Sequence, residues 1–234
     1  MKKTKFGIVV FPGTWSDQDC YHAVSTILGN QSVFLWHKET DLKDIDCLIL
    51  PGGFSYGDYL RPGAIARFSP IMNEIIKFAN SGKPVIGICN GFQILCEANL
   101  LPGILLPNNV LEFRCAKTHL RVENNISTFS NECHNNQILN IPISHGEGNY
   151  YADNDTLEEL ESNDRILFRY SSGNGDISKD YNPNGSINNI AGIINKNKNV
   201  LGMMPHPERS CESILGSTDG NYIFKSIMKS ITQS

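Results

Sequence analysis

Short apolar runs alternate with amphipathic segments through the first half of the chain, and this pattern constrains the fold more than any other feature. The runs occupy residues 6–11, 33–37, 47–53 and 84–88. Strands that are apolar on both faces and alternate with helices are typical of a parallel sheet covered on both sides. The sequence therefore predicts an α/β fold with an open, doubly wound, mostly parallel sheet.

The segments between these runs predict helices at residues 17–28, 64–80 and 91–98. The pattern is clearest in residues 64–80, where apolar side chains recur at three- and four-residue spacings. The stripe consists of Ile65, Phe68, Ile71, Met72, Ile75, Ile76 and Ala79.

The second half is less regular and predicts an extension of the sheet with several antiparallel strands. Residues 156–162 and 220–231 predict helices, and the polar residues 171–189 predict a long surface loop because an apolar run follows directly. We find no repeat and no clear boundary, so we expect residues 1–234 to form a single domain. The expected strands are residues 110–113, 126–129, 138–144, 166–170, 190–194 and 200–204.

Composition excludes several classes of protein. A chain of 234 residues can bury a core without help from a metal or disulfides. Its formal charge of −4 argues against nucleic acid as the main partner. The seven cysteines are an odd number without a C-x-x-C motif, which fits free thiols in a reducing compartment. No apolar run is long enough for a signal peptide or a membrane span, so we expect a cytoplasmic protein.

The strongest local motif is Gly87-Ile88-Cys89-Asn90-Gly91, which follows an apolar run and leads into a helical pattern. It matches the G-x-nucleophile-x-G elbow, with cysteine as the nucleophile. The flanking glycines would remove Cβ atoms that clash in a sharp strand-to-helix turn, and the helix N-terminus would favour a thiolate. The alternative is a small buried cysteine with no chemical role.

A cysteine nucleophile needs a base and a group that orients it. Among the six histidines, His206 stands between two prolines, with Glu208 two residues later. Prolines hold such a loop extended, and residues two apart in an extended segment point the same way, so the carboxylate could orient the imidazole. His145 and Glu147 form a rival pair. Two such pairs also suit a metal, but no third ligand stands at a recognisable spacing.

An acyl-transfer site also needs donors for the oxyanion. Pro51-Gly52-Gly53 follows the third apolar run, and the N–H groups of Gly53 and Asn90 could form the pair. The alternative is a simple turn. The glycine-rich stretch is not followed by the Lys-Ser/Thr of a phosphate-binding loop, so the sequence contains no such nucleotide motif.

Taken together, PGG, GICNGFQ and PHPE occur in the order found in class I, triad-type glutamine amidotransferase domains, and the chain resembles that family over nearly its whole length. Four longer segments indicate one subgroup within this family, because they are similar to the glutaminase subunits of phosphoribosylformylglycinamidine synthase. These segments are residues 50–69, 87–95, 142–151 and 199–210.

The resemblance implies a flavodoxin-like class I glutaminase fold and a defined chemistry. Cys89 would attack the side-chain amide of L-glutamine, release ammonia and form a thioester that water hydrolyses. His206 would move the proton, and Glu208 would orient His206.

The resemblance also implies that Gly53 and Asn90 stabilise the oxyanion and that Gln93 contacts the bound glutamine. The ammonia would pass to a separate synthetase subunit that acts on formylglycinamide ribonucleotide in purine biosynthesis, often with a small bridging subunit. ATP and Mg²⁺ are expected on that synthetase, and this chain is expected to need no cofactor. Residues 55–67 and 145–149 would lie near the glutamine pocket or the docking face.

One loop departs from the family pattern. The family usually has PGSNCD after the first strand, whereas this chain has Trp15 and Ser16 at the Asn and Cys positions. We expect this change to affect local packing or partner contacts and to leave the triad intact.

Three other functions remain open at this point. The chain could supply ammonia to another synthetase, serve as a docking scaffold that has lost glutaminase activity, or be a free-standing cysteine hydrolase of related fold. The PHPE motif together with Gln93 after the elbow favours a glutaminase over a peptidase.

Overall fold

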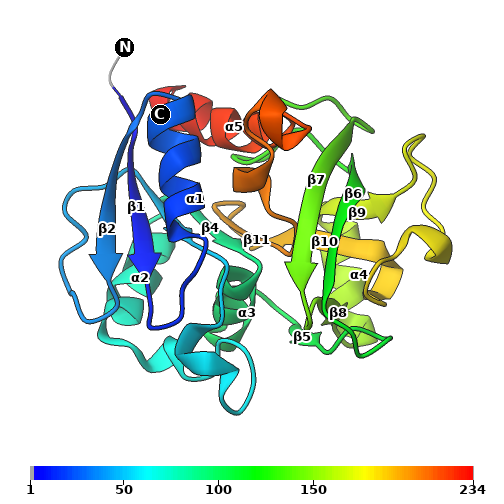
Figure 1. Ribbon diagram of the computed structural model, residues 1–234, viewed down its shortest axis with the longest axis horizontal. Coiled ribbons are helices and arrows are strands. Elements are labelled where there is room, and N and C mark those ends of the chain that lie inside the picture. The colour runs from blue at the N-terminus through cyan, green and yellow to red at the C-terminus, as the bar shows by residue number, and fades with distance from the viewer. Residues whose placement is uncertain (1–2, 234) are drawn as a thin grey trace.

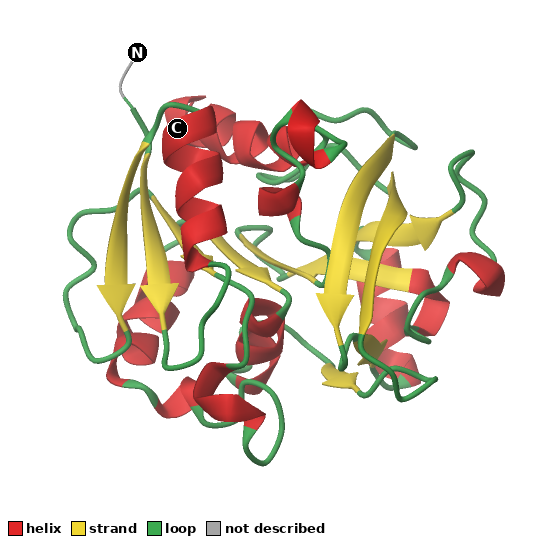
Figure 2. Cartoon of the chain, in the orientation of Figure 1, coloured by secondary structure: helices red, strands yellow, loops and turns green. Residues whose placement is uncertain are grey.

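The computed structural model describes residues 3–233, which form an α/β fold built on a nine-stranded sheet (Figures 1 and 2). One part of the sheet is parallel, in the order β2-β1-β3-β4-β11. These strands are buried and apolar as predicted, apart from the partly exposed edge strand β2. Their bounds are β1 Lys5–Val10, β2 Gln31–Trp36, β3 Cys47–Leu50, β4 Val85–Ile88 and β11 Val200–Met203.

Beyond β11 the sheet continues as the predicted antiparallel extension, in the order β10-β9-β6-β7. A separate antiparallel pair, β5 and β8, lies beside it. The sheet runs without interruption from β2 to β7, and the assignment of one domain to the whole chain stays a prediction. The bounds are β5 Ile104–Leu106, β6 Arg114–Val122, β7 Ile138–His145, β8 Asn149–Tyr151, β9 Ile166–Ser171 and β10 Ile190–Ile194.

Helices cover both faces of the parallel strands, with α1 in front of the sheet and α2 behind it in Figure 1. The α1 helix runs on into a π-helical turn (His22–Ile27) and so covers the predicted segment 17–28. The α3 helix packs on β4, β11 and β3. The helix bounds are α1 Asp17–Tyr21, α2 Pro70–Asn80, α3 Asn90–Glu97, α4 Asn154–Ser162 and α5 Gly220–Gln233.

Three predicted elements are wrong in position. The helix expected from residue 64 begins at Pro70, because the residue before a proline avoids the helical region and Ser69 is extended. The strands expected at 110–113 and 126–129 are turns, and the true strand β6 lies between them. Its first half is largely exposed and mixes basic with small side chains, so no apolar run marks it.

The carboxyl ends of β1, β3, β4 and β11 lie at one edge of the sheet, because these strands are parallel. The successive antiparallel pairings of β10, β9, β6 and β7 reverse direction four times, so β7 also ends at this edge. Figure 1 shows β6 and β7 curling in front of β10 and β11. The Pro142 carbonyl of β7 accepts a 2.8 Å hydrogen bond from the His206 N–H. Strand ends from both halves therefore meet at one place.

Candidate active site

Cys89 occupies a strained turn between β4 and α3. Its backbone has φ 52° and ψ −106°, a region that non-glycine residues rarely adopt and that costs about 1–3 kcal/mol. Its N–H donates to the Met203 carbonyl at 2.8 Å, which joins the turn to the end of β11. The turn therefore holds the thiol at the carboxyl edge of the sheet, as the motif predicts.

The two glycines beside Cys89 are needed for close packing. A Cβ atom at Gly87 would lie 2.5 Å from Leu95 Cδ1 and 2.6 Å from the Gly91 carbonyl oxygen. A Cβ atom at Gly91 would overlap the Leu50 carbonyl of β3. Helix α3 can therefore begin directly after the strand only because both positions lack a side chain.

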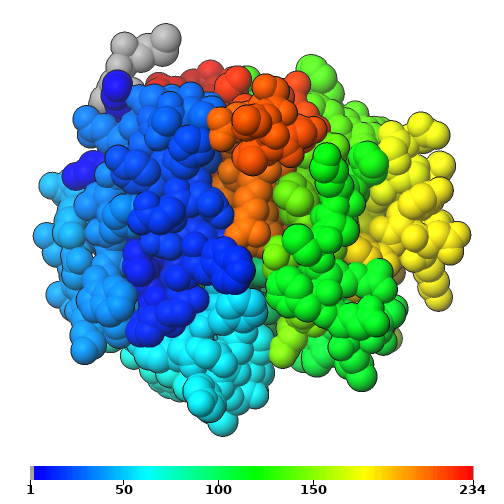
Figure 3. Space-filling view, viewed as in Figure 1, coloured from blue at the N-terminus to red at the C-terminus, as the bar shows by residue number. Residues whose placement is uncertain are grey.

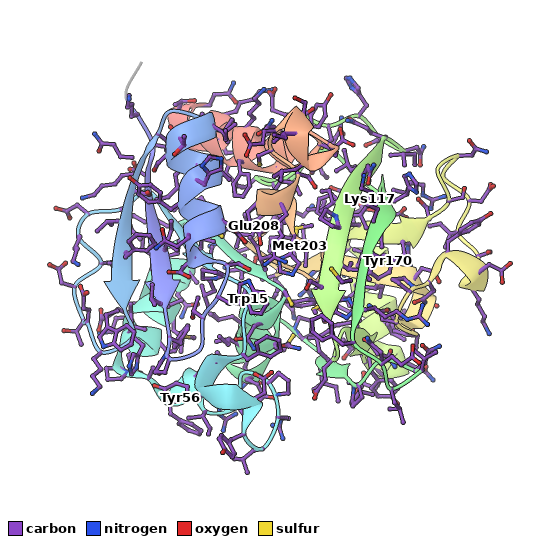
Figure 4. All side chains as sticks on the ribbon, viewed as in Figure 1. Trp15, Tyr56, Lys117, Tyr170, Met203 and Glu208 are labelled. Carbon is purple, nitrogen blue, oxygen red and sulfur yellow. The ribbon has the colours of Figure 1, made fainter. Side chains whose placement is uncertain are left out.

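His206 and Glu208 form a buried pair beside this turn. His206 Nδ1 lies 2.6 Å from Glu208 Oε1, and each residue is only 2% exposed. A Cβ atom at Gly52 would lie 2.7 Å from His206 Cε1 and 3.5 Å from Cys89 Cβ, so the imidazole and the thiol flank the same glycine. Glu208 and Met203 appear near the centre of the molecule in Figure 4.

The local conformation behind this pair differs from the prediction. Residues Pro207–Arg209 form a 3-10 turn that starts at a proline, and the segment is not extended. The turn still brings Glu208 back to His206, so the predicted contact forms by a different geometry.

Neighbouring charge sets the protonation of His206. Burial lowers the pKa of the imidazole, but the Glu208 carboxylate and the Cys89 sulfur outweigh this effect and raise the pKa to about 10. The ring nitrogen that faces away from Glu208, Nε2, is buried and has no hydrogen-bond partner that meets normal geometry within residues 3–233. The imidazole thus holds its proton strongly, and Nε2 is the nitrogen that can exchange a proton with a reacting group.

Gly53 and Asn90 lie on either side of this edge, at the ends of β3 and β4. In the described chain, the backbone bonds here use the N–H groups of Trp15, Ser16 and Phe54, and none joins the N–H of Gly53 or Asn90 to a backbone acceptor. A Cβ atom at Gly53 would lie 2.7 Å from the Gly13 carbonyl oxygen, so this glycine is required by close approach of the chain.

Side-chain amides link the start of α3 to two neighbouring loops. Asn90 Nδ2 donates to Gln93 Oε1 at 2.9 Å, and Asn90 Oδ1 accepts from the Ser55 N–H at 3.1 Å. Gln93 Nε2 donates to the Glu147 carbonyl at 2.6 Å. These bonds hold the loops after β3 and β7 against the helix that follows Cys89.

Cys89, His206, Gly53 and Gln93 line a pocket of about 120 Å³ at the carboxyl edge, whereas Asn90 and Glu208 are not among its lining residues. Residues 55–67 and 145–149, expected near such a pocket, contribute to its wall, and so does the departing loop of Trp15 and Ser16. In Figure 3 the blue, cyan, green and orange segments of the chain meet on one face. The lining residues are Trp15, Ser16, Gly53, Phe54, Asp58, Pro62, Cys89, Gln93, Phe113, Ser144, His145, Gly146, Glu147, His206 and Arg209.

The rival base His145 is engaged by asparagines. Its Nδ1 lies 3.1 Å from Asn108 Oδ1 and its Nε2 lies 3.4 Å from Asn184 Nδ2. Burial and the charge of His206 lower the pKa of His145 to about 4, so the ring is neutral. His145 therefore shapes the pocket wall without the carboxylate partner that the H-x-E spacing suggested.

Asp58 and Arg209, which also line the pocket, have no individual role predicted from the sequence, and Glu147 is predicted only as the partner of the rival base His145. Arg209 follows the PHPE motif directly, and it donates to Asp19 Oδ2 at 3.1 Å and to Ser16 Oγ at 2.9 Å. The unusual Ser16 is thus tied to the loop of the His206–Glu208 pair. The position of Arg209 directly after the PHPE motif was the one sequence feature that could have pointed to it.

No three His, Cys, Asp or Glu side chains within residues 3–233 gather as a group that could hold a metal. No helix among these residues has the length and apolar character needed to cross a membrane.

The chain matches known proteins over nearly its full length. A model described as a CobB/CobQ-like glutamine amidotransferase domain matches residues 3–223. Phosphoribosylformylglycinamidine synthase subunit PurQ of Moorella thermoacetica is 58% identical over 96% of this chain and 95% of that protein. The same subunit of Salinibacter ruber is 53% identical over 97% of both chains.

Solved structures agree with this relationship. A chain in the structure of PurLQS from Thermotoga maritima is 40% identical, with a TM-score of 0.86 over 98% of this chain and 99% of that one. A second structure, of a glutamine amidotransferase from Thermotoga maritima, is 14% identical over 100% of this chain and 86% of that one. Its TM-score of 0.56 indicates a shared fold. The chain belongs to the family of PurQ subunits of phosphoribosylformylglycinamidine synthase, which are glutamine amidotransferases.

Proposed function

We propose that this chain hydrolyses L-glutamine through a Cys89 thioester and delivers the ammonia to a synthetase subunit for purine biosynthesis. The observation that supports this proposal most directly is one pocket lined by a strained cysteine and by His206, which is itself paired with the buried Glu208. The pocket volume of about 120 Å³ compares with roughly 10–15 Å³ for one water, which leaves space for a molecule of about ten heavy atoms. Glutamine is of this size.

The first half of the reaction forms a carbon–sulfur bond and breaks a carbon–nitrogen bond. The Cys89 sulfur, whose proton is held on His206, attacks the amide carbon, and the N–H groups of Gly53 and Asn90 donate to the oxyanion. His206 then gives the proton to the departing nitrogen. Ammonia leaves, and a γ-glutamyl thioester remains on Cys89.

The second half regenerates the nucleophile. His206 accepts a proton from water, which attacks the thioester carbon, and the carbon–sulfur bond breaks. Glutamate leaves, and the proton stays on His206. Glu208 holds the imidazole through Nδ1 in both halves, so that Nε2 handles the transferred proton. Gln93 positions the substrate from α3.

The partners follow from the family. The relatives are named as subunits of one synthase, and the Thermotoga structure is named for a PurLQS complex. We assign to this chain a synthetase partner that converts formylglycinamide ribonucleotide to formylglycinamidine ribonucleotide with ATP, and a small bridging subunit. We propose that ATP and Mg²⁺ act on the synthetase and that this chain needs no cofactor, since thiol, imidazole and carboxylate suffice for acyl transfer. Seven free cysteines support a cytoplasmic location.

The proposed intermediate can be trapped directly. The complex with the synthetase is mixed with glutamine, quenched in acid and analysed by peptide mass spectrometry. We expect one glutamyl group on the peptide that contains Cys89, and none in Cys89→Ala. The exposed Cys115 provides a matched control, because Cys115→Ser should trap the adduct as the wild type does. An adduct on another residue, or none under turnover, would contradict the mechanism.

A further inference from the structure

Two carboxylates in the pocket have no role in the reaction described above. Asp58 and Glu147 both line the pocket that contains Cys89. Asp58 belongs to the loop after β3, and Glu147 follows β7. The folding of the chain thus brings two acidic side chains from distant segments to one small space.

No cation of the described chain neutralises this pair. Burial and the charge of Glu147 raise the pKa of Asp58 to about 6, although a hydrogen bond from Asn90 acts in the opposite direction. Burial also raises the pKa of Glu147. No Lys, Arg or His within residues 3–233 contributes to either shift. Two carboxylates that repel each other are costly unless a cation joins them.

Hydrogen bonds fix the pair relative to the nucleophile. Asn90 Nδ2 donates to Asp58 Oδ1 at 3.4 Å and to Gln93 Oε1 at 2.9 Å. Gln93 Nε2 then donates to the main-chain carbonyl of Glu147 at 2.6 Å. The pair is thus attached to the first turn of α3, which begins next to Cys89.

A separate feature marks this space as a ligand site. His206 is 2% exposed and lines the same pocket, and its Nε2 has no hydrogen-bond partner of normal geometry among the described residues. A buried polar atom without a partner is costly unless a ligand contacts it. The acidic pair and this nitrogen therefore belong to one site for one molecule.

We propose that Asp58 and Glu147 together bind the α-ammonium group of the substrate and thereby select α-amino acid amides over amides that lack this group. The inference rests on the proposed glutaminase function and adds its specificity. A primary ammonium donates three hydrogen bonds and matches two carboxylates in charge. Its binding removes the repulsion between Asp58 and Glu147 and orients the side-chain amide toward Cys89.

The test compares two substrates that differ only in this group. L-Glutamine and glutaramate, which is glutamine without the α-amino group, are assayed with the complex that contains the synthetase. For Asp58→Asn and Glu147→Gln we expect kcat/KM for glutamine to fall about 10- to 100-fold, mostly through KM. The value for glutaramate should change by less than about twofold. If glutaramate is not hydrolysed, its inhibition constant is compared instead.

Glu147→Gln is the cleaner variant, because Gln93 contacts the main chain at this position and the bond survives the change. Glu74→Gln on α2 serves as the matched control, since its side chain pairs with Lys77 on the helix surface. Equal losses for both substrates would mean that the carboxylates only support the fold of the pocket, and no loss for either substrate would mean that they bind something else. Either result overturns the inference. A wild-type complex that hydrolyses neither substrate would instead overturn the proposed function.

Discussion

At the scale of single residues, the proton affinity of the site depends on one buried contact. Burial by itself lowers the pKa of His206, and the charge of Glu208 together with the Cys89 sulfur reverses this to about 10. The 2.6 Å contact between Nδ1 and Oε1 also fixes the ring orientation. Glu208 therefore has two effects, on charge and on geometry, and replacement by glutamine removes mainly the first.

This residue makes a pH-dependent contribution to stability. The pKa of folded His206 lies above its ordinary value of 6.5. Between pH 6.5 and about 10, the folded protein therefore keeps a proton that the unfolded chain has already released. The stabilisation is complete below pH 6.5 and is lost as the pH rises toward 10. We expect the free energy of unfolding in urea to fall over this range more steeply in the wild type than in Glu208→Gln. Parallel profiles would show that Glu208 does not raise the pKa.

At the scale of elements, the turn between β4 and α3 depends on its two glycines. Gly91→Ala places a Cβ atom against the Leu50 carbonyl of β3, which must shift. We expect a loss of about 1–3 kcal/mol in the free energy of unfolding, the usual cost of overpacking a well-filled site.

Gly173→Ala is the matched control for this prediction. Its added Cβ atom would meet nothing closer than the His119 ring at 3.7 Å, and its φ is not positive. We expect a change within about 0.5 kcal/mol, as for most surface substitutions. Similar unfolding energies for the two variants in urea titrations would refute the role assigned to Gly91.

Elements with a clear apolar run or stripe could be predicted from the sequence, and strand β6, which has neither over its first half, could not. The strands of the parallel sheet are runs of apolar residues because both of their faces are covered. Strand β6 has basic and small side chains in its largely exposed first half, so it shows no such run, whereas the apolar residues at 110–113 resemble a strand but lie in turns. Helix α2 begins later than its apolar stripe, because Pro70 keeps the backbone of Ser69 out of the helical region.

Some residues of the site could be predicted from the sequence, because they stand in short motifs, and others could not. Cys89, His206 and Glu208 stand in short motifs, so local sequence identified them, and the structure brings them together. The positions of Asp58 and Glu147 depend on a loop and on the curl that returns β7 to the carboxyl edge. Such long-range geometry leaves no periodic signal in the chain.

At the scale of the whole molecule, apolar side chains gather around the mouth of the pocket. The rings of Trp15 and Phe54 are 6.0 Å apart, and those of Phe54 and Phe113 are 6.3 Å apart. Figure 4 shows Trp15 at the seam between the two halves of the molecule. The adjoining loop exposes Tyr59 by 74% and Leu60 by 92%. We therefore expect the synthetase to dock on this face.

We expect Leu60→Ser to weaken association with the synthetase about tenfold or more, because exposed apolar anchors dominate binding at such faces. The basal glutaminase activity of the isolated chain should stay unchanged. Ile214→Ser is the control, since Ile214 is also highly exposed but belongs to the turn Ser213–Leu215. Binding is measured by calorimetry, and wild-type affinity in Leu60→Ser would exclude this loop from the interface.

Coupling between the subunits should also appear in the rate. We expect the isolated chain to hydrolyse glutamine weakly and the assembled complex to do so strongly, because an ammonia source that feeds a partner should not run idle. The measurement is ammonia release with and without the synthetase. High turnover by the isolated chain would contradict this coupling.

The central claim is that Cys89 generates ammonia for a reaction that the synthetase completes. The most direct test is the Cys89→Ser variant in the assembled complex, assayed for formylglycinamidine ribonucleotide with glutamine or with ammonium as nitrogen donor. We predict that synthesis from glutamine is lost while synthesis from ammonium is retained. Continued synthesis from glutamine would contradict the account.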